Sequence, residues 1–333
     1  MKRTIAVGGT HGKTTTASMA AHVLRESGRD PAFLIGGELR SAGTNADWGE
    51  GAWAVIEADE SDRSFLKLYR PVAVVTNVEL DHHATYANLG QLEAAFAEFA
   101  EPTELLILGP GVELQSRGRE VRFDVRGRVE LFPGGSRFDV QGTEVELRVP
   151  GRHNILNALG ALAACRAAGV EPAEAAPALA TFTGAARRFE SHGRTASGAR
   201  IFDDYAHHPT EVRATLEAAR TLGAKGRLVA CFQPHLYSRT RLLAREFGRA
   251  LALADLVVVL DVYPARERAE DFPGVSGLMV AQAAADAAGG RPVWWLARME
   301  DAERMLAAEL GEGDILLTMG AGDVDHLARG LAA

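Results

Sequence analysis

The sequence has few cysteines and no long apolar run, and each absence excludes a class of protein. Only Cys165 and Cys231 occur, far apart and without a C-x-x-C or Cys/His spacing. We therefore predict two buried thiols and neither a disulfide framework nor a zinc site. No apolar stretch approaches the roughly 18 residues of a membrane-spanning helix, and the first residues carry no secretory leader. These patterns predict a cytoplasmic protein without membrane insertion.

A basic surface is also missing. The formal net charge is -8 and the isoelectric point is near 5.7, so nucleic acid is not an expected partner. Hydrophobic residues make up 47% and charged residues 24% of the chain, which is the balance of a globular protein. A length of 333 residues suits two domains of about 150 residues each.

Apolar runs of strand length alternate with amphipathic stretches of helical length. In the first half, this alternation predicts strands at residues 4–7, 32–35, 53–57 and 72–76 and a helix at residues 14–27. Such alternation is typical of an α/β fold with a mostly parallel sheet. Residues 112–149 differ, because short alternating stretches separated by glycines predict an excursion of antiparallel hairpins.

A second α/β alternation follows in the C-terminal half. A helix is expected at residues 155–168 with Asn154 as its N-cap, and a new series of strands begins after Gly184. These strands are expected at residues 200–202, 228–232, 256–260, 293–295 and 315–319. We place the domain boundary near residue 184, with domains of residues 1–183 and 184–333.

A glycine-rich loop joins the first strand to the first helix. Its residues are Gly9, Thr10, His11, Gly12, Lys13, Thr14 and Thr15. In a phosphate-binding loop, backbone N–H groups surround phosphate oxygens, the lysine contacts the β and γ phosphates, and the following hydroxyl binds Mg²⁺. Val7 replaces the first glycine of the strict pattern, so this is a variant loop. ATP and Mg²⁺ are the expected cofactors, and the first domain is predicted to be of the P-loop type.

Acidic residues and histidine follow the next two predicted strands. Glu57 ends the strand predicted at residues 53–57 and Glu60 follows it, while Asp81 and His82 come after residues 72–76. Ligands bind at the carboxyl edge of a parallel sheet, where such side chains are suitable Mg²⁺ ligands. The run of residues 81–84 also spells a metal phosphoesterase signature, which would predict hydrolysis without ATP.

Several motifs together resemble the Mur ligases of peptidoglycan synthesis. They are residues 9–16, 57–62, 76–82, 151–158, 187–190, 203–211, 232–235, 238–240 and 320–323, in family order over nearly the whole chain. Within the family, the resemblance is strongest to the members that join L-alanine to UDP-N-acetylmuramate. It implies a C-terminal Rossmann-like domain and formation of an amide bond through an acyl phosphate.

The resemblance also implies roles for individual residues. Lys13 holds phosphates, Thr14 and Glu57 bind one Mg²⁺, with Glu60 as the alternative to Glu57, and His82 binds a second Mg²⁺. Adenine is read by Asn154 and Asn157, while Arg188 and Asp204 of the second domain approach the nucleotide. His207, His208 and Arg239 then face the acyl phosphate and the incoming alanine, and one of the histidines assists the amine.

The chain departs from patterns seen in the family in three ways. Members carry an N-terminal domain of roughly a hundred residues that binds the UDP moiety, and this sequence begins with the motifs that follow such a domain. We therefore expect UDP binding to be supplied either by that domain, if the chain is a fragment, or by a partner chain. Leu236 stands where many alanine ligases have arginine, and Arg239, Arg241 or Arg187 is expected to compensate. No lysine lies between Lys67 and Lys225, which argues against the sister ligases that use a carbamylated lysine.

Two alternatives to the alanine ligase stay open. One is another ligase of this type, which adds a peptide to the same sugar acid or lengthens folate with glutamate. The other is a nucleotide-binding module without full ligase activity.

Overall fold

The computed structural model describes residues 2–333, and the chain divides into two compact units, Met1–Ala186 and Arg187–Ala333. Each unit has its own sheet, with separate core clusters on the two faces of that sheet. The division lies beside the boundary expected near residue 184. The α/β class with parallel-rich sheets is confirmed in both units.

The first unit is built on a seven-stranded sheet. Its strands are β1 (Arg3–Gly8), β2 (Ala32–Leu39), β3 (Thr44–Asp47), β4 (Trp53–Glu57), β5 (Val72–Val75), β6 (Leu105–Leu108) and β7 (Arg119–Arg122), in the order β3-β2-β4-β1-β5-β6-β7. Only β3 runs antiparallel to its neighbour. Because β1 pairs with both β4 and β5 in parallel, the segments that follow these three strands emerge at one edge.

Helices cover both faces of this sheet. They are α1 (Lys13–Glu26), α2 (Leu89–Ala100), α3 (Arg152–Ala167), α4 (Pro172–Thr181) and the 3-10 helix η1 (Ser64–Lys67). Side chains alternate along β1, so Ile5 and Val7 pack with α1, α3 and α4, whereas Ala6 packs with α2 and η1. A sheet covered on both faces explains why its central strands are apolar throughout.

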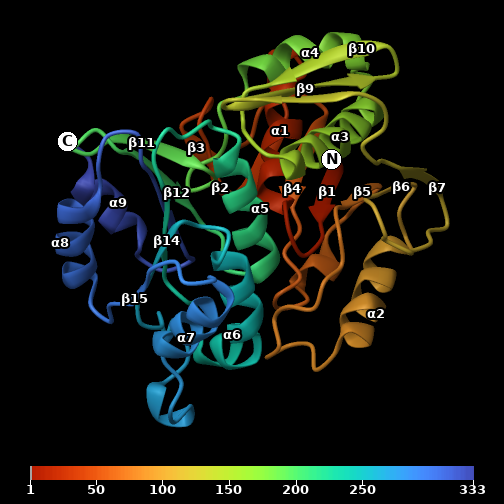
Figure 1. Ribbon diagram of the computed structural model, residues 1–333. Helices are drawn as coiled ribbons and strands as arrows, with labels where there is room; N and C mark the ends of the chain where they lie inside the picture. Colours follow the sequence, from red (N-terminus) through yellow and green to blue (C-terminus); the bar gives the residue numbers. More distant parts are fainter. Residues whose placement is uncertain (1) are drawn as a thin grey trace. The chain divides into compact units, whose positions relative to one another are not determined.

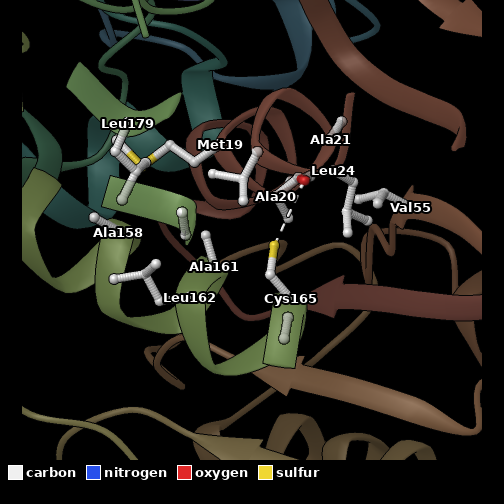
Figure 2. Packing of buried hydrophobic residues seen from close by; sticks show 14 of the residues in the cluster. Met19, Ala20, Ala21, Leu24, Val55, Ala158, Ala161, Leu162, Cys165 and Leu179 are labelled. Atoms are coloured by element: carbon white, nitrogen blue, oxygen red, sulfur yellow. Dashed lines mark hydrogen bonds between the residues drawn. The ribbon is translucent and has the colours of Figure 1, made fainter. Parts of the chain in front are cut away.

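Small side chains let α1 and α3 lie close together. Ala20 faces Ala161 and Cys165, and the Cys165 thiol donates a 3.6 Å contact to the Ala20 carbonyl (Figure 2). Both cysteines are buried, as predicted, and burial raises the pKa of the Cys231 thiol to about 12. A thiol with so high a pKa is a packing group and not a nucleophile.

The antiparallel excursion is shorter than expected. It consists of β8 (Val129–Phe132), β9 (Gly135–Val140) and β10 (Thr143–Leu147), and Figure 1 shows β9 and β10 beside α4. The prediction was wrong for Arg119–Arg122, because this segment is β7 and pairs in parallel with β6 at the sheet edge. An exposed edge strand shows the same alternation as a hairpin strand, so the pattern alone does not separate them.

The helix expected at residues 155–168 begins earlier. Gly151 is the N-cap of α3, so the prediction that Asn154 caps this helix was wrong. Asn154 lies within the first turn, where its amide Nδ2 donates to the Pro150 carbonyl at 2.7 Å. Gly151 takes the N-cap position with a φ of 98°, a left-handed value that favours glycine.

The second unit contains a six-stranded sheet. Its strands are β11 (Glu190–Arg194), β12 (Arg200–Asp204), β13 (Leu228–Phe232), β14 (Leu256–Val259), β15 (Val293–Trp295) and β16 (Ile315–Met319), in the order β11-β12-β16-β13-β14-β15. All neighbours are parallel except β11 and β12. The antiparallel edge strand β11 was not predicted.

Five α-helices flank this sheet within the second unit. They are α5 (Pro209–Arg220), α6 (Tyr237–Leu251), α7 (Gly277–Ala287), α8 (Met299–Glu309) and α9 (Asp325–Leu331), with a short 3-10 helix η2 (Ala269–Asp271). Residues of α5, α6 and α7 share one core cluster, and residues of α8 and α9 share the other. Across residues 2–333, no helix is long and apolar enough to cross a membrane.

Candidate active site

The glycine-rich loop leaves β1 and enters α1 in a conformation that requires glycine at two positions. Gly9 and Gly12 have φ values of 120° and 81°. A Cβ at Gly9 would lie 2.1 Å from the Thr76 hydroxyl, and one at Gly12 would lie 2.4 Å from Asn157 Oδ1. The loop is therefore packed tightly against the chain on both sides, with Thr14 and Thr15 in the first turn of α1.

The segment after β5 holds this loop in place. Asn77 bonds both sides of the His11 peptide unit, since its Oδ1 accepts from His11 N at 2.9 Å and its Nδ2 donates to His11 O at 2.9 Å. The Thr10 hydroxyl donates to the Glu79 carbonyl and accepts from Glu79 N, at 2.8 and 2.9 Å. These reciprocal bonds fix the direction of the loop's peptide groups before any phosphate arrives.

The ammonium of Lys13 lies in the centre of the loop. Its Nζ donates to the carbonyls of Gly9 and Thr10 at 2.8 and 3.1 Å, and it lies 2.9 Å from Glu60 Oε2. Burial disfavours the charged ammonium, but nearby carboxylates, Glu60 foremost, outweigh this effect and raise the pKa of Lys13. Lys13 therefore carries a full positive charge at the centre of the glycine-rich loop.

Glu60 connects this lysine to His82. The Glu60 side chain is fully buried, and its Oε1 lies 3.3 Å from His82 Nε2. Ligand atoms of Asp59, Glu60 and His82 all lie within 4.8 Å of one another. Burial opposes ionisation of Asp59, yet Lys13 and hydrogen bonds from Ser61 keep the pKa of this carboxyl below its usual value. The carboxyl oxygens of Asp59 and Glu60 suit Mg²⁺, which prefers oxygen ligands, and the imidazole can complete the set.

His82 is held in an uncommon backbone conformation. Its φ is 53°, and its N–H donates to Asp81 Oδ1 at 2.7 Å. The His82 carbonyl accepts from Thr85 N and Tyr86 N at 2.7 and 3.0 Å. Hydrogen bonds on both sides of the residue thus aim the imidazole at Glu60, as expected for a strained functional residue.

Glu57 occupies a different position from Glu60. Its Oε1 accepts from the Thr14 hydroxyl at 2.9 Å, and its Oε2 accepts from Gly36 N at 2.6 Å. The predicted metal-binding residues Thr14, Glu57 and His82 thus fall into two adjacent groups, one around Thr14 and one around Glu60. Thr14, Glu57 and His82 nevertheless lie close together. Lys13 and Thr14 are consecutive, Thr14 contacts Glu57, and Lys13 contacts Glu60, which in turn contacts His82.

The two predicted adenine residues lie beside the loop. Asn157 Nδ2 donates to Asn154 Oδ1 at 3.0 Å, and Asn157 Oδ1 accepts from the Thr16 hydroxyl at 3.3 Å. Both amides are buried and engaged with the protein. Asn157 lies next to Gly12 and contacts Asn154, but reading adenine by either residue stays a prediction.

In the second unit, Asp204 lies at the carboxyl end of β12. Its two oxygens accept from Phe189 N at 2.9 Å and from Ala206 N at 2.8 Å. Burial, helped by the charge of Glu211 and opposed by Arg188, raises the pKa of Asp204 to about 7. The Arg188 guanidinium lies over the Tyr205 ring, 5.1 Å from its centroid. Arg188 and Asp204 are therefore neighbours within the second unit, and their approach to a nucleotide stays a prediction.

The paired histidines after β12 have different environments. His207 Nδ1 lies 2.9 Å from the Tyr205 carbonyl. Because a carbonyl only accepts, this nitrogen carries the proton in the neutral ring and Nε2 keeps its lone pair. His208 is the N-cap of α5, and its Nδ1 accepts from Thr210 N at 3.4 Å.

An aromatic and cationic cluster surrounds the start of α6. Arg239 is buried, with its Nη1 3.2 Å from His235 Nδ1. The His235 ring stacks on Tyr263 at 5.8 Å and lies 6.0 Å from the His207 ring. Arg187, one candidate to compensate for Leu236, is instead bound to Asp203 and to the carbonyls of Gly320 and Gly322.

Sequence reasoning did not single out every residue of these sites. Asn77 and Glu79 were quoted as part of a motif but not as supports of the phosphate loop. No sequence motif included Tyr263. The residue follows β14, and only the folded chain brings its ring onto His235. A search for aromatic residues after strands of a parallel sheet would have included it.

Family models cover most of the chain. The Mur ligase middle domain matches residues 7–108, and the glutamate ligase domain of Mur ligases matches residues 187–322. The first range contains Lys13, Glu57 and His82, and the second contains Asp204, His207 and Arg239. The phosphoesterase interpretation of residues 81–84 is thereby replaced.

Curated relatives and a solved structure agree with these models. The chain is 43% identical to the UDP-N-acetylmuramate–L-alanine ligase of Chlorobaculum tepidum, over 100% of this chain and 74% of that protein. It is 45% identical to the enzyme of the same name from Streptomyces coelicolor, over 98% of this chain and 74% of that protein. The crystal structure of UDP-N-acetylmuramate-alanine ligase from Thermotoga maritima superposes with a TM-score of 0.83 at 30% identity, covering 99% of this chain and 74% of that one. The predicted resemblance is confirmed, and this chain belongs to the Mur ligase family of ATP-dependent ligases.

Proposed function

We propose that this Mur ligase uses ATP and Mg²⁺ to join L-alanine to UDP-N-acetylmuramate, forming ADP and phosphate. The observation that carries the proposal is the group of Lys13, Glu60 and His82 at the phosphate loop, where 2.9 and 3.3 Å contacts link a lysine to a metal-binding set. The substrates follow from the names of the relatives, which are 43% and 45% identical to the chain.

A carboxylate does not react with an amine directly, because oxide is a poor leaving group. In the proposed reaction, a carboxylate oxygen of the sugar acid attacks the γ-phosphorus and ADP leaves, which gives an acyl phosphate. The amine nitrogen of alanine then attacks the acyl carbon and phosphate leaves. Both steps bring anions together, so their rate depends on charges that are in place beforehand.

The first unit supplies these charges in the proposal. Lys13 is buried with a raised pKa, so its ammonium stays charged and faces the triphosphate. Thr14 with Glu57, and Asp59 with Glu60 and His82, are the two sets that would hold Mg²⁺. When bound, Mg²⁺ neutralises phosphate charge and lets the second anion approach. Asn154 and Asn157 are assigned to the adenine ring.

The second unit supplies groups for the amine in the proposal. His207 Nδ1 is directed at the Tyr205 carbonyl, so Nε2 is the nitrogen that can accept a proton in the neutral ring. His207 is therefore the better candidate to take the amine proton, since His208 uses its Nδ1 as a helix cap. Arg239 is assigned to an anionic group of the reactants, and Arg188 and Asp204 to the nucleotide.

The test is amine-dependent ADP release in the presence of UDP-N-acetylmuramate. We expect release with L-alanine and none when Lys13→Ala replaces the loop lysine. Lys67→Ala is the matched control, because this lysine is exposed and lies in the same unit. Release that persists in Lys13→Ala would refute the role of the loop. ATP binding without amine-dependent release would favour the nucleotide-binding module, and a preference for glutamate or a peptide would favour a sister ligase.

A further inference from the structure

The turn between β13 and α6 carries His235 and leads directly to Arg239. Its backbone conformation is unfavourable and needs contacts from outside the turn. Leu236, at the N-cap position of α6, has φ 68° and ψ 134°. This combination is unfavourable for any residue with a Cβ and persists only where surrounding contacts impose it. The apolar Leu236 side chain also has no acceptor for the first N–H groups of the helix.

The segment that follows β14 supplies the missing contacts. Tyr263 N donates to the Pro234 carbonyl at 2.8 Å, and Leu236 N donates to the Tyr263 carbonyl at 3.0 Å. These two bonds form an isolated parallel bridge between His235 and Tyr263 beyond the end of the β13 and β14 pairing. The Tyr263 ring also stacks on His235, with 12° between the two planes. The turn is thus supported from a segment about 30 residues further along the chain.

Glu267 completes this support at the helix itself. Its Oε2 accepts from Ser238 N at 2.9 Å, and its Oε1 accepts from the Ser238 hydroxyl at 2.5 Å. Ser238 is the second residue of α6, so the carboxylate takes the place of a local N-cap. A negative charge at this end also interacts favourably with the helix dipole.

The next residue along the helix is Arg239. Its side chain is only 3% exposed, and its guanidinium reaches His235 at 3.2 Å. Fraying of the first turn of α6 would move the Cα of Arg239. Because the guanidinium lies at the far end of a long side chain, it would be displaced as well. The position of the Arg239 guanidinium therefore depends on the backbone at Ser238, and the position of Ser238 depends on Glu267.

We propose that Glu267 is a positioning residue that holds Arg239 in place for the carboxylate of the incoming amino acid. The inference rests on the proposed function, because it takes Arg239 as the group that binds an anionic part of the reactants. A guanidinium pairs with a carboxylate through two parallel hydrogen bonds, and such pairing is sensitive to small displacements. Glu267 touches neither substrate nor nucleotide in this account.

The first experiment needs no activity. In Glu267→Ala, amide hydrogen exchange at Ser238 and Arg239 should rise about fivefold to tenfold, and the Arg239 Nε–Hε signal should broaden in NMR spectra. Glu267→Gln should show a smaller change, because an amide oxygen still accepts from Ser238 N. Glu270→Ala is the matched control, an exposed acid in the same loop, and should leave both readouts unchanged. Unchanged exchange in Glu267→Ala would overturn the proposal, whether or not the protein is active.

The second experiment compares L-alanine with L-alaninamide, which lacks the carboxylate. The ratio of kcat/KM for L-alanine over L-alaninamide should fall about tenfold in Glu267→Ala, with the KM for ATP unchanged. The same substitution added to Arg239→Ala should have no further effect on this ratio. Equal losses for both amines would contradict positioning of Arg239 and assign Glu267 a purely structural role. Wild-type protein that releases no ADP with any amine would instead refute the proposed function, while hydrogen exchange and the Arg239 signal still decide whether Glu267 holds the turn.

Discussion

The buried contact between Lys13 and Glu60 provides a test of how the glycine-rich loop is stabilised. Replacing Glu60 by Gln removes the carboxylate charge and keeps the volume. Lys13 Nζ lies 2.9 Å from Glu60 Oε2, and both side chains are buried. At an effective dielectric constant of about 20, two charges at this distance attract by about 6 kcal/mol. Since the two carbonyls on Nζ and the neighbouring carboxylates remain, we expect a loss of about 3–5 kcal/mol in the free energy of unfolding.

Hydrogen exchange of the amides in β1 and α1 under increasing urea measures this loss for the first unit alone. Glu98→Gln is the control, because Glu98 pairs with Arg63 at 3.4 Å on the exposed surface. That pair is worth only about 0–1 kcal/mol. A loss below about 1 kcal/mol in Glu60→Gln would refute the reasoning, since Glu60 would then not be the main counter-charge of Lys13.

The same variant gives a second, linked result. A bound triphosphate supplies new negative charge to Lys13, so the deficit of Glu60→Gln should shrink when ATP is added without divalent ions. At a fixed ATP concentration of about 100 times the wild-type dissociation constant, the wild type gains about 2.7 kcal/mol, and the variant should bind ATP more tightly and gain more. An equal gain in both proteins would mean that phosphate does not replace Glu60 at the lysine.

Three further perturbations have defined outcomes. Gly12→Ala puts a Cβ 2.4 Å from Asn157 Oδ1 and should weaken ATP binding at least about tenfold by calorimetry, whereas Gly28→Ala, with nothing within 4 Å, should not. Arg70→Lys should lower the free energy of unfolding by about 2–3 kcal/mol in urea titrations, because the buried guanidinium donates to four backbone carbonyls that one ammonium does not reach together; an unchanged midpoint would contradict this. Burial lowers the pKa of His22, so its contribution to stability is full above the usual pKa of about 6.5 and is lost as pH falls below it. The slope of stability against pH between 6.5 and 5 should therefore be smaller in His22→Gln, and an unchanged slope would assign the acid sensitivity to other groups.

Local patterns were enough to predict the phosphate loop. Gly9, Gly12, Lys13 and Thr14 are close in sequence, and their roles depend on one strand, one turn and one helix. The near-continuous apolar runs of the central strands, separated by helical stretches, likewise predicted a parallel sheet, because burial on both faces leaves such a run. Predictions were weaker at the sheet edge, where β7 was mistaken for a hairpin strand and β11 was missed.

Other features depend on which parts of the chain meet. The sequence left Glu57 and Glu60 as alternative metal ligands, but Glu57 at the end of β4 contacts Thr14, whereas Glu60 in the segment after β4 contacts Lys13 and His82. Asn154 has the residue type of an N-cap, yet the helix begins at Arg152. In both cases the exact residue at which a strand or helix ends or begins decides the direction of a side chain.

By itself, the sequence determined the α/β class, the phosphate loop and the family, because each follows from residues a few positions apart or from motifs in a constant order. Tertiary structure alone decided that Asn77 holds the loop, that Glu60 is shared by Lys13 and His82, and that Glu267 caps the helix of Arg239. Glu267 and Ser238 are 29 residues apart, and the free energy of such a contact depends on the geometry of the whole sheet that brings them together. No local propensity encodes that geometry.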